Sequence, residues 1–208
     1  MKKFFSLLFS ACMLMTLTAC GSSTAAGSEG ASSKAAASSN TDNAQAQAKS
    51  KTLVVYFSAS GNTKSVAERI ASLAKADTYE IVPAEPYTAD DLNYNVDNCR
   101  ANMEMKDAAA RPAIGSKAID ISQYDTVIIG YPIWWGTMPR IINTFLDAYD
   151  LSGKTVLPFC TSGGSDVVQS VSDIRSAEPG ADVHSGLHAQ NAHDSAIEGW
   201  LKDNGIGK

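Results

Sequence analysis

The sequence is poor in the residues that form metal sites and disulfide frameworks. Its 208 residues include only four cysteines and three histidines. The cysteines have no C-x-x-C or other metal-like spacing, and His184, His188 and His193 do not form a metal-binding set. Positive charge is also scarce, with 17 Lys and Arg against 22 Asp and Glu. We therefore expect no metal, and the acidic balance argues against a nucleic-acid partner and against flat adsorption to anionic lipid.

Several familiar motifs of catalysis and nucleotide binding are also missing. The chain has no G-x-S-x-G and no persuasive pair of a nucleophile with a histidine, which argues against a hydrolase. It has neither the G-x-x-x-x-G-K-[ST] of a phosphate-binding P-loop nor the G-x-G-x-x-G of a dinucleotide site. We expect no acid–base side chain to carry catalysis.

Residues 1–19 have the composition of an export signal. A basic Lys-Lys start precedes an apolar run over residues 4–17, which is too short to span a bilayer comfortably. The run ends in Leu-Thr-Ala-Cys-Gly, which resembles the lipobox of bacterial lipoproteins; the resemblance implies cleavage before Cys20 and a lipid on that cysteine. We expect a protein exported and lipid-anchored on the extracytoplasmic face of the cell membrane. An ordinary signal peptide and an uncleaved anchor are the alternatives.

Composition divides the rest of the chain into a tether and one domain. Residues 20–50 contain the candidate lipidated Cys20 and then mostly Ser, Ala, Gly, Asn, Gln and Thr, with no large apolar residue. Such a segment cannot bury enough surface to order itself, so we interpret it as a disordered tether spanning roughly 30 Å. A stalk that orders against a partner is the alternative. Residues 51–208 suit one domain with one core.

The domain retains two cysteines, Cys99 and Cys160. Cys160 ends an apparent buried strand, where a lone cysteine is typical of apolar packing. We interpret Cys160 as a core residue rather than as half of a disulfide with Cys99.

Short apolar runs alternate with helical patterns along the domain. Three runs without polar alternation predict central strands of a parallel sheet: 53–57, 126–130 and 155–159. Two weaker patterns predict outer strands: 78–82 and 182–187. Apolar spacing predicts helices in five places: around 66–74, and over 89–106, 139–149, 166–176 and 193–204. This alternation predicts an open, doubly wound parallel sheet with helices on both faces and ligands beyond the carboxyl ends of its strands.

Three polar or aromatic loops follow the central strands. The loop over residues 58–63 joins hydroxyls and one glycine to a helix start, which favours a single terminal phosphate; an ordinary capped helix is the alternative. The loop over 131–139 carries Trp134 and Trp135, and we expect one of them in the core and the other stacked on a flat ligand. The loop over 161–166 is rich in glycine and could contact a ring edge with its amides, or it is a plain connection with a helix cap.

These segments together resemble the flavodoxin-like family. The stretch Val-Val-Tyr-Phe-Ser-Ala-Ser-Gly-Asn-Thr over 54–63 resembles the FMN-phosphate signature, and 131–139 resembles the Y-P-I-W-W-G-x-x-P segment of its small members. The resemblance covers nearly all of residues 51–206 and implies a five-stranded parallel sheet of order 2-1-3-4-5 with FMN as cofactor. It implies phosphate contacts from Ser58, Ser60, Gly61, Asn62 and Thr63, and ring contacts from Pro132, Ile133, Trp134, Trp135, Gly136, Thr161, Ser162, Gly163 and Gly164.

The chain departs from many flavodoxins in one respect. The loop over 161–165 has no aromatic residue to cover the second face of the flavin, so we expect that face to be partly open. The resemblance implies electron transfer to a redox partner protein or a small-molecule acceptor. Two alternatives remain open: an FMN-dependent NAD(P)H:quinone or small-molecule reductase, and a ligand-binding module without redox activity.

Overall fold

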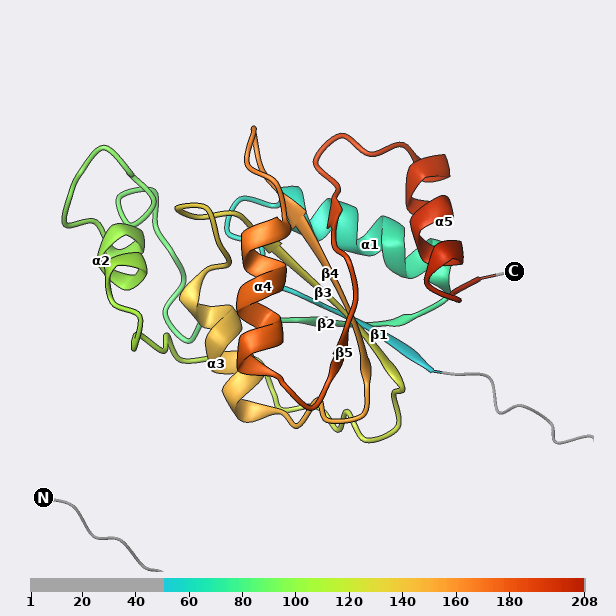
Figure 1. Ribbon diagram of the computed structural model, residues 1–208. Helices are drawn as coiled ribbons and strands as arrows, with labels where there is room; N and C mark the ends of the chain where they lie inside the picture. Colours follow the sequence, from blue (N-terminus) through green and yellow to red (C-terminus); the bar gives the residue numbers. More distant parts are fainter. Residues whose placement is uncertain (1–50, 208) are drawn as a thin grey trace, which may run out of the picture. The chain divides into compact units, whose positions relative to one another are not determined.

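The sheet has five positions, in the order β2-β1-β3-β4-β5 (Figure 1). The structure, a computed structural model, describes residues 51–207. All neighbouring strands are parallel. The strands are β1 (Thr52–Tyr56), β2 (Asp77–Glu80), β3 (Thr126–Pro132), β4 (Thr155–Thr161), β5 (Asp182–Val183) and β6 (Leu187–His188). The predicted strand order and the flavodoxin-like α/β class are confirmed.

The last position of the sheet is divided between two short strands. Strand β5 pairs with the start of β4, and β6 pairs with its end at Phe159 and Cys160. The single strand expected over 182–187 is therefore interrupted. Gly186 lies in the gap, where a Cβ would come within 2.7 Å of the Val167 side chain. The chain therefore passes so close to the start of α4 that a side chain at this position would clash.

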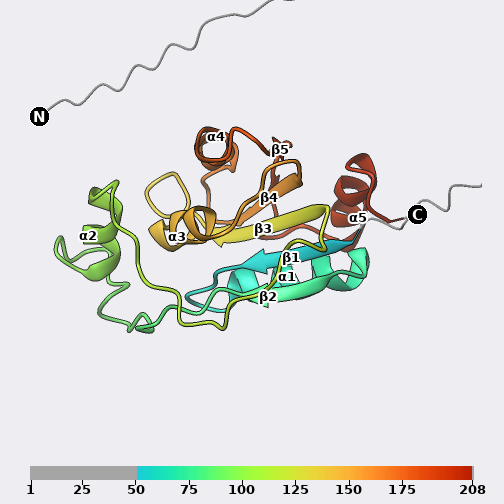
Figure 2. The ribbon, with the colours of Figure 1, turned by 90° about the horizontal axis from the view of Figure 1, so that it is seen from below.

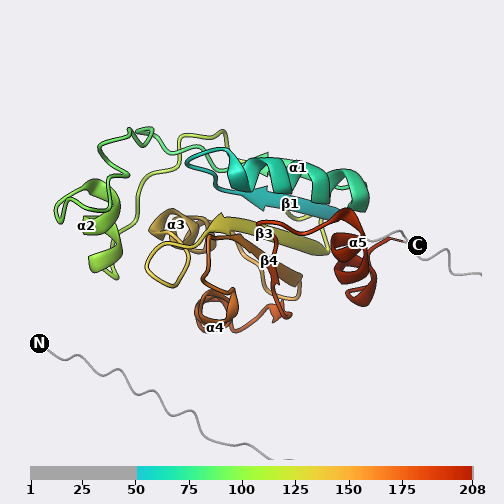
Figure 3. The same ribbon diagram turned by 90° about the horizontal axis from the view of Figure 1, so that it is seen from above.

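Four helices cover the two faces of the sheet, as predicted. Helices α1 (Asn62–Ala74) and α5 (Asp194–Asp203) pack on one face, and α3 (Arg140–Ala148) and α4 (Val168–Ala177) on the other (Figure 3). Alternate strand residues point to opposite faces, so Val54 joins the core under α1 while its neighbour Val55 joins the core under α3. Both side chains are fully buried.

The connection from β2 to β3 leaves the sheet as a long excursion, residues 84–113. Its two ends lie side by side: Pro83 pairs with Ile114, and the amide of Ala84 donates to the carbonyl of Ala113 at 2.8 Å. The excursion contains α2 (Arg100–Lys106), which lies beyond the carboxyl ends of β1 and β3 (Figures 2 and 3).

The helix expected over residues 89–106 is wrong for most of its length. Only the last seven residues, 100–106, are helical; turns and bends occupy most of 89–99. Asparagine and aspartate side chains compete for backbone partners in non-helical conformations, and this stretch is rich in both. The carboxylate of Asp91, for example, accepts the amide and the hydroxyl of Thr88 at 2.9 and 2.8 Å.

Specific contacts fix the excursion against the sheet. The Tyr87 ring packs edge-on against Trp134 with 5.3 Å between ring centroids, and its hydroxyl donates to Glu104. The Arg100 guanidinium lies 4.1 Å from the centre of the Tyr87 ring and bonds the same carboxylate. The Arg140 guanidinium on α3 donates to the carbonyl of Met105 at 3.1 Å. The excursion is thus held in place from several directions.

Three sequence predictions concern segments outside the described residues: the signal over 1–19, the lipid on Cys20 and the tether over 20–50. No helix in the described range is long and apolar enough to cross a membrane. Cys99 and Cys160 are free, buried thiols, and burial raises the pKa of the Cys160 thiol to about 12. The interpretation of Cys160 as a packing residue is therefore confirmed.

Candidate functional site

The loop after β1 forms an open cradle at the start of α1. Gly61 precedes the helix with φ +88°, and no side chain caps the first turn, which also lacks acidic residues. Ser58 Oγ accepts the Gly61 amide at 3.1 Å. Within the described chain, the next three amides, of Asn62, Thr63 and Lys64, have no acceptor. Unpaired amides at the positive end of a helix dipole are suited to an anion.

Thr63 and Thr161 meet beneath this cradle. Their Oγ1 atoms are 2.8 Å apart, and both residues are almost completely buried. The hydrogen bond ties the first turn of α1 to the end of β4. The Thr63 side chain therefore points into the protein, and its unpaired backbone amide is the group available for the phosphate contact predicted for this residue.

The loop after β3 is a tight two-residue hairpin. Trp134 and Thr137 exchange backbone hydrogen bonds of 2.9 and 3.1 Å around Trp135 and Gly136. The two central residues have φ values of +48° and +80°, the pattern of a type I′ turn. A positive φ costs a bulky residue such as Trp135 about 1–2 kcal/mol, whereas Gly136 adopts it freely.

The two tryptophans occupy opposite environments. Trp134 is 3% exposed and packs edge-on against Phe57, with ring centroids 5.7 Å apart. Trp135 is 55% exposed. A large aromatic ring held in solvent on a strained backbone is typical of a binding site. As expected, one tryptophan, Trp134, lies in the core, and the other, Trp135, is exposed to solvent, where a flat ligand could stack on it.

The loop after β4 leaves an open surface beside the hairpin. The Ile133 amide donates to the Thr161 carbonyl at 3.0 Å, which joins the two loops. The ring Nε2 of His188 donates to the Ser162 carbonyl at 3.0 Å and so supports the loop from β6. No atom lies within 4 Å of a Cβ built at Gly163.

These loops enclose a cavity of about 390 Å³, a volume common for small-molecule sites. It is lined by Ala59, Ser60, Asn62, Leu92, Tyr94, Pro132, Ile133, Trp134, Thr161, Ser162, Gly163 and Gln190. A second hollow of about 290 Å³ is lined by Tyr94, Ile133, Trp134 and Trp135. Eight predicted site residues line the larger cavity and Trp135 lines the second. Five more lie in the same loops without lining either space: Ser58, Gly61, Thr63, Gly136 and Gly164.

Four residues of the larger cavity were missed from the sequence: Ala59, Leu92, Tyr94 and Gln190. Leu92 and Tyr94 belong to the stretch interpreted as helix, and Gln190 follows β6. The run Asn-Tyr-Asn-Val-Asp-Asn over 93–98 could have indicated turns, but nothing in it indicates contact with Trp134.

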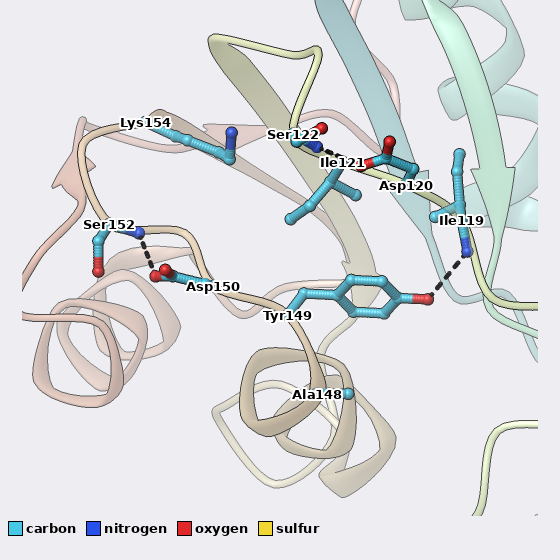
Figure 4. A pocket seen from close by; sticks show the side chains of 9 residues that line it. All are labelled: Ile119, Asp120, Ile121, Ser122, Ala148, Tyr149, Asp150, Ser152 and Lys154. Carbon is cyan, nitrogen blue, oxygen red and sulfur yellow. Dashed lines mark hydrogen bonds between the residues drawn. The ribbon is translucent and has the colours of Figure 1, made fainter.

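A further cavity, of about 410 Å³, lies near the amino ends of β3 and β4 (Figure 4). The Asp120 and Asp150 carboxylates in its wall accept nearby backbone amides at 2.9 Å, and the Lys154 ammonium donates to the Tyr124 carbonyl at 2.7 Å. The charged groups of this cavity therefore already have hydrogen-bond partners within the protein. The cavity also lies at the amino ends of the strands, whereas open parallel sheets bind ligands beyond the carboxyl ends.

Comparison with known proteins identifies the family. The family model described as flavodoxin matches residues 51–204. A protein from Bacteroides eggerthii, proposed to be a flavoprotein, is 45% identical, with a TM-score of 0.72 over 76% of this chain and 99% of its own. A flavoprotein from Lactobacillus acidophilus, solved in complex with FMN, is 30% identical, with a TM-score of 0.60 over 73% of this chain and 98% of its own. No protein with a curated description matches.

The chain therefore belongs to the flavodoxin family, as its sequence motifs predicted.

Proposed function

We propose that this chain is an FMN-binding electron-transfer protein, exported and tethered to the membrane surface through a lipid on Cys20. The prediction of FMN as cofactor is confirmed by the family match and by the FMN complex of the Lactobacillus acidophilus relative. Electron transfer, export and the tether are the parts that this proposal adds.

The observation that carries the proposal is the match between the site and FMN. A cradle with free amides and one glycine suits one terminal phosphate, and an amide-rich, partly aromatic cavity opens next to it. Ser58, Ser60 and the unpaired amides of residues 62–64 would hold the phosphate, with Gly61 at the turn that exposes them. The loops over 132–136 and 161–164 would orient the ring. Bound FMN supplies the redox chemistry, and the protein positions it and tunes its electronics.

The lining of the cavity favours electron carriage over acid–base catalysis. Among its twelve lining residues, none is an Asp, Glu, Lys, Arg, His or Cys. The Cys160 thiol lies in the core, where burial raises its pKa to about 12. The residues around the ring would therefore chiefly bind FMN, orient it and exclude water.

Lys51, where a tether would join the domain, is far from the candidate FMN site, and this position supports a redox partner that approaches from the aqueous phase. Lys51 lies at the amino end of β1, where its carbonyl accepts the Asp125 amide at 3.1 Å. The cradle begins at Ser58, seven residues later and roughly 23 Å along an extended strand. A tether that joins at Lys51 would leave the site at the far end of the domain. A redox partner protein or a small-molecule acceptor could then reach it.

Purification of the membrane-extracted protein tests the redox part of the proposal. We expect a yellow protein that releases FMN by mass spectrometry, takes up electrons from dithionite and passes them to an acceptor in a screen. Stoichiometric FAD, or no flavin after reconstitution, would contradict it. Rapid oxidation of NAD(P)H with a quinone would instead support the reductase alternative.

Cell fractionation tests the anchor. Wild-type protein should pellet with membranes, and a Cys20→Ala variant should lose its lipid and its membrane association. A wild-type protein whose mass carries no lipid on Cys20 would contradict the anchor, and equal membrane association of the two proteins with residues 1–19 retained would support the uncleaved alternative.

A further inference from the structure

We propose that Tyr94 is a cofactor-binding residue that closes one flank of the site over the flavin ring. This inference rests on the proposed binding of FMN. Tyr94 lines both the cavity of about 390 Å³ beside the cradle and the second hollow of about 290 Å³, together with Ile133 and Trp134. It therefore stands where the two spaces meet, next to the exposed Trp135.

The order of the strands puts Tyr94 and the loop after β4 on opposite sides of the cavity. Tyr94 arrives on the excursion that leaves β2, at one edge of the sheet, whereas Thr161 ends β4 and Gly163 follows it. Ile133 and Trp134, which follow the intervening strand β3, lie between them. The excursion thus adds a second aromatic residue on the Trp135 side of the cavity, opposite the loop over 161–165.

The contacts of the Tyr94 ring are aromatic. Its centroid lies 5.1 Å from that of Trp135 with the planes at 76°, and 6.3 Å from that of Trp134 at 64°. No hydrogen bond to the Tyr94 hydroxyl occurs within residues 51–207, and 46% of the residue is exposed. The ring is therefore not required to fill the core, and a tyrosine in such surroundings is suited to contact a flat ligand.

Asn102 fixes the backbone beneath this ring. Its buried side-chain amide donates to the carbonyls of Tyr94 and Val96 at 3.1 and 2.8 Å. The main chain of this turn is thus tied to α2, whereas the Tyr94 side chain is half exposed. A ring on a fixed backbone can adjust its torsions to a ligand while staying at the mouth of the site. Asn102 is accordingly a positioning residue.

The inference is tested by the rate at which FMN dissociates from the full chain. The protein is extracted in mild detergent and loaded with FMN before the measurement. Tyr94→Ala should speed FMN dissociation roughly 5-fold, the loss expected for one aromatic contact, and should raise quenching of flavin fluorescence by iodide. Tyr94→Phe should keep both values near wild type, because the ring rather than the hydroxyl makes the contact. Val96→Ala is the matched control, because Val96 is 43% exposed in the same turn but lines neither space.

The outcomes separate this inference from the proposed function. If wild-type protein binds FMN and Tyr94→Ala changes neither dissociation nor iodide access, the role of Tyr94 is wrong and the proposed function stands. If wild-type protein does not bind FMN, both fail. An equal effect of Val96→Ala would assign the change to the turn as a whole and overturn the specific role of Tyr94. Thermal unfolding of each apoprotein checks that the variants are folded.

Discussion

Thr63 and Thr161, 98 positions apart in the sequence, share a buried hydrogen bond of 2.8 Å between their hydroxyls. Thr63 lies in the first turn of the helix that presents the phosphate cradle, and Thr161 ends the strand that leads to the ring-facing loop. The bond therefore joins two separate parts of the site through the core and fixes their spacing.

This pair should show strong coupling in a double-mutant cycle. Thr63→Val or Thr161→Val alone leaves one buried hydroxyl without its partner, at a cost of about 1–3 kcal/mol in the free energy of unfolding. The double variant removes both hydroxyls and keeps the shapes, so it should cost less than the sum of the single variants. Urea unfolding of the four apoproteins measures the coupling. Additive losses would show that the hydroxyls do not depend on each other.

The two neighbouring tryptophans should separate stability from binding. Trp134→Ala empties a buried site and should cost about 3–5 kcal/mol of stability. Trp135→Gly should change stability by less than about 1 kcal/mol, because relief of the positive φ offsets the lost contact with Tyr94. It should nevertheless weaken FMN binding by about 1–3 kcal/mol, the usual contribution of aromatic stacking. Unfolding curves and FMN titrations measure both. A large stability loss in Trp135→Gly would mean that this ring is structural.

The sheet and its three loops could be predicted because their signals are local. Apolar runs such as 126–130 can be buried on both faces only in a covered parallel sheet, and a parallel sheet gathers the loops after its strands at one end. The residue pattern also predicted that one tryptophan would be buried. Placement of Trp134 in the core and Trp135 in solvent depends on turn geometry that the glycine at 136 indicated only in part.

The excursion could not be predicted for the opposite reason. Its path is set by contacts between distant residues, such as the Pro83–Ile114 pairing and the bond from Arg140 to Met105. Leu92, Val96 and Cys99 have helical spacing, but side chains that flank this stretch hold it in turns: Asp91 accepts the Thr88 amide, and Asn102 donates to two carbonyls of the turn. Tyr94 was missed as a site residue because its place in the cavity follows from that path.

Two glycines of the site provide a matched test of backbone geometry. No atom lies within 4 Å of a Cβ built at Gly136 or at Gly163, but only Gly136 has a positive φ. Gly136→Ala should therefore cost about 1–2 kcal/mol of stability, whereas Gly163→Ala should be neutral or slightly stabilising. Gly136→Asn should recover part of the loss, because asparagine tolerates this conformation. Chemical unfolding measures all three. Equal costs at the two positions would contradict the hairpin geometry.

His184 should make part of the stability depend on pH. Its Nδ1 lies 2.7 Å from Asn204 Oδ1 and its Nε2 lies 3.0 Å from Asp182 Oδ2, so a doubly protonated ring donates to both acceptors. These hydrogen bonds, to Asn204 first and Asp182 second, raise the pKa of His184 above its ordinary 6.5. Arg175 opposes the shift through its positive charge.

The direction of the pH effect follows from the raised pKa. A group that holds its proton more tightly in the folded state stabilises the fold below its unfolded pKa, and this contribution is lost as pH rises through the folded pKa. The stability difference between wild type and His184→Gln should therefore be larger near about pH 5 than near about pH 8. The effect should be small, because the side chain is about one-third exposed. Asp182→Asn removes the charged acceptor and should reduce the pH dependence while leaving the ring in place. Urea unfolding of the three proteins at both pH values measures the difference. If the stability of wild type and of His184→Gln changes with pH in parallel, His184 has the same pKa in the folded and unfolded states.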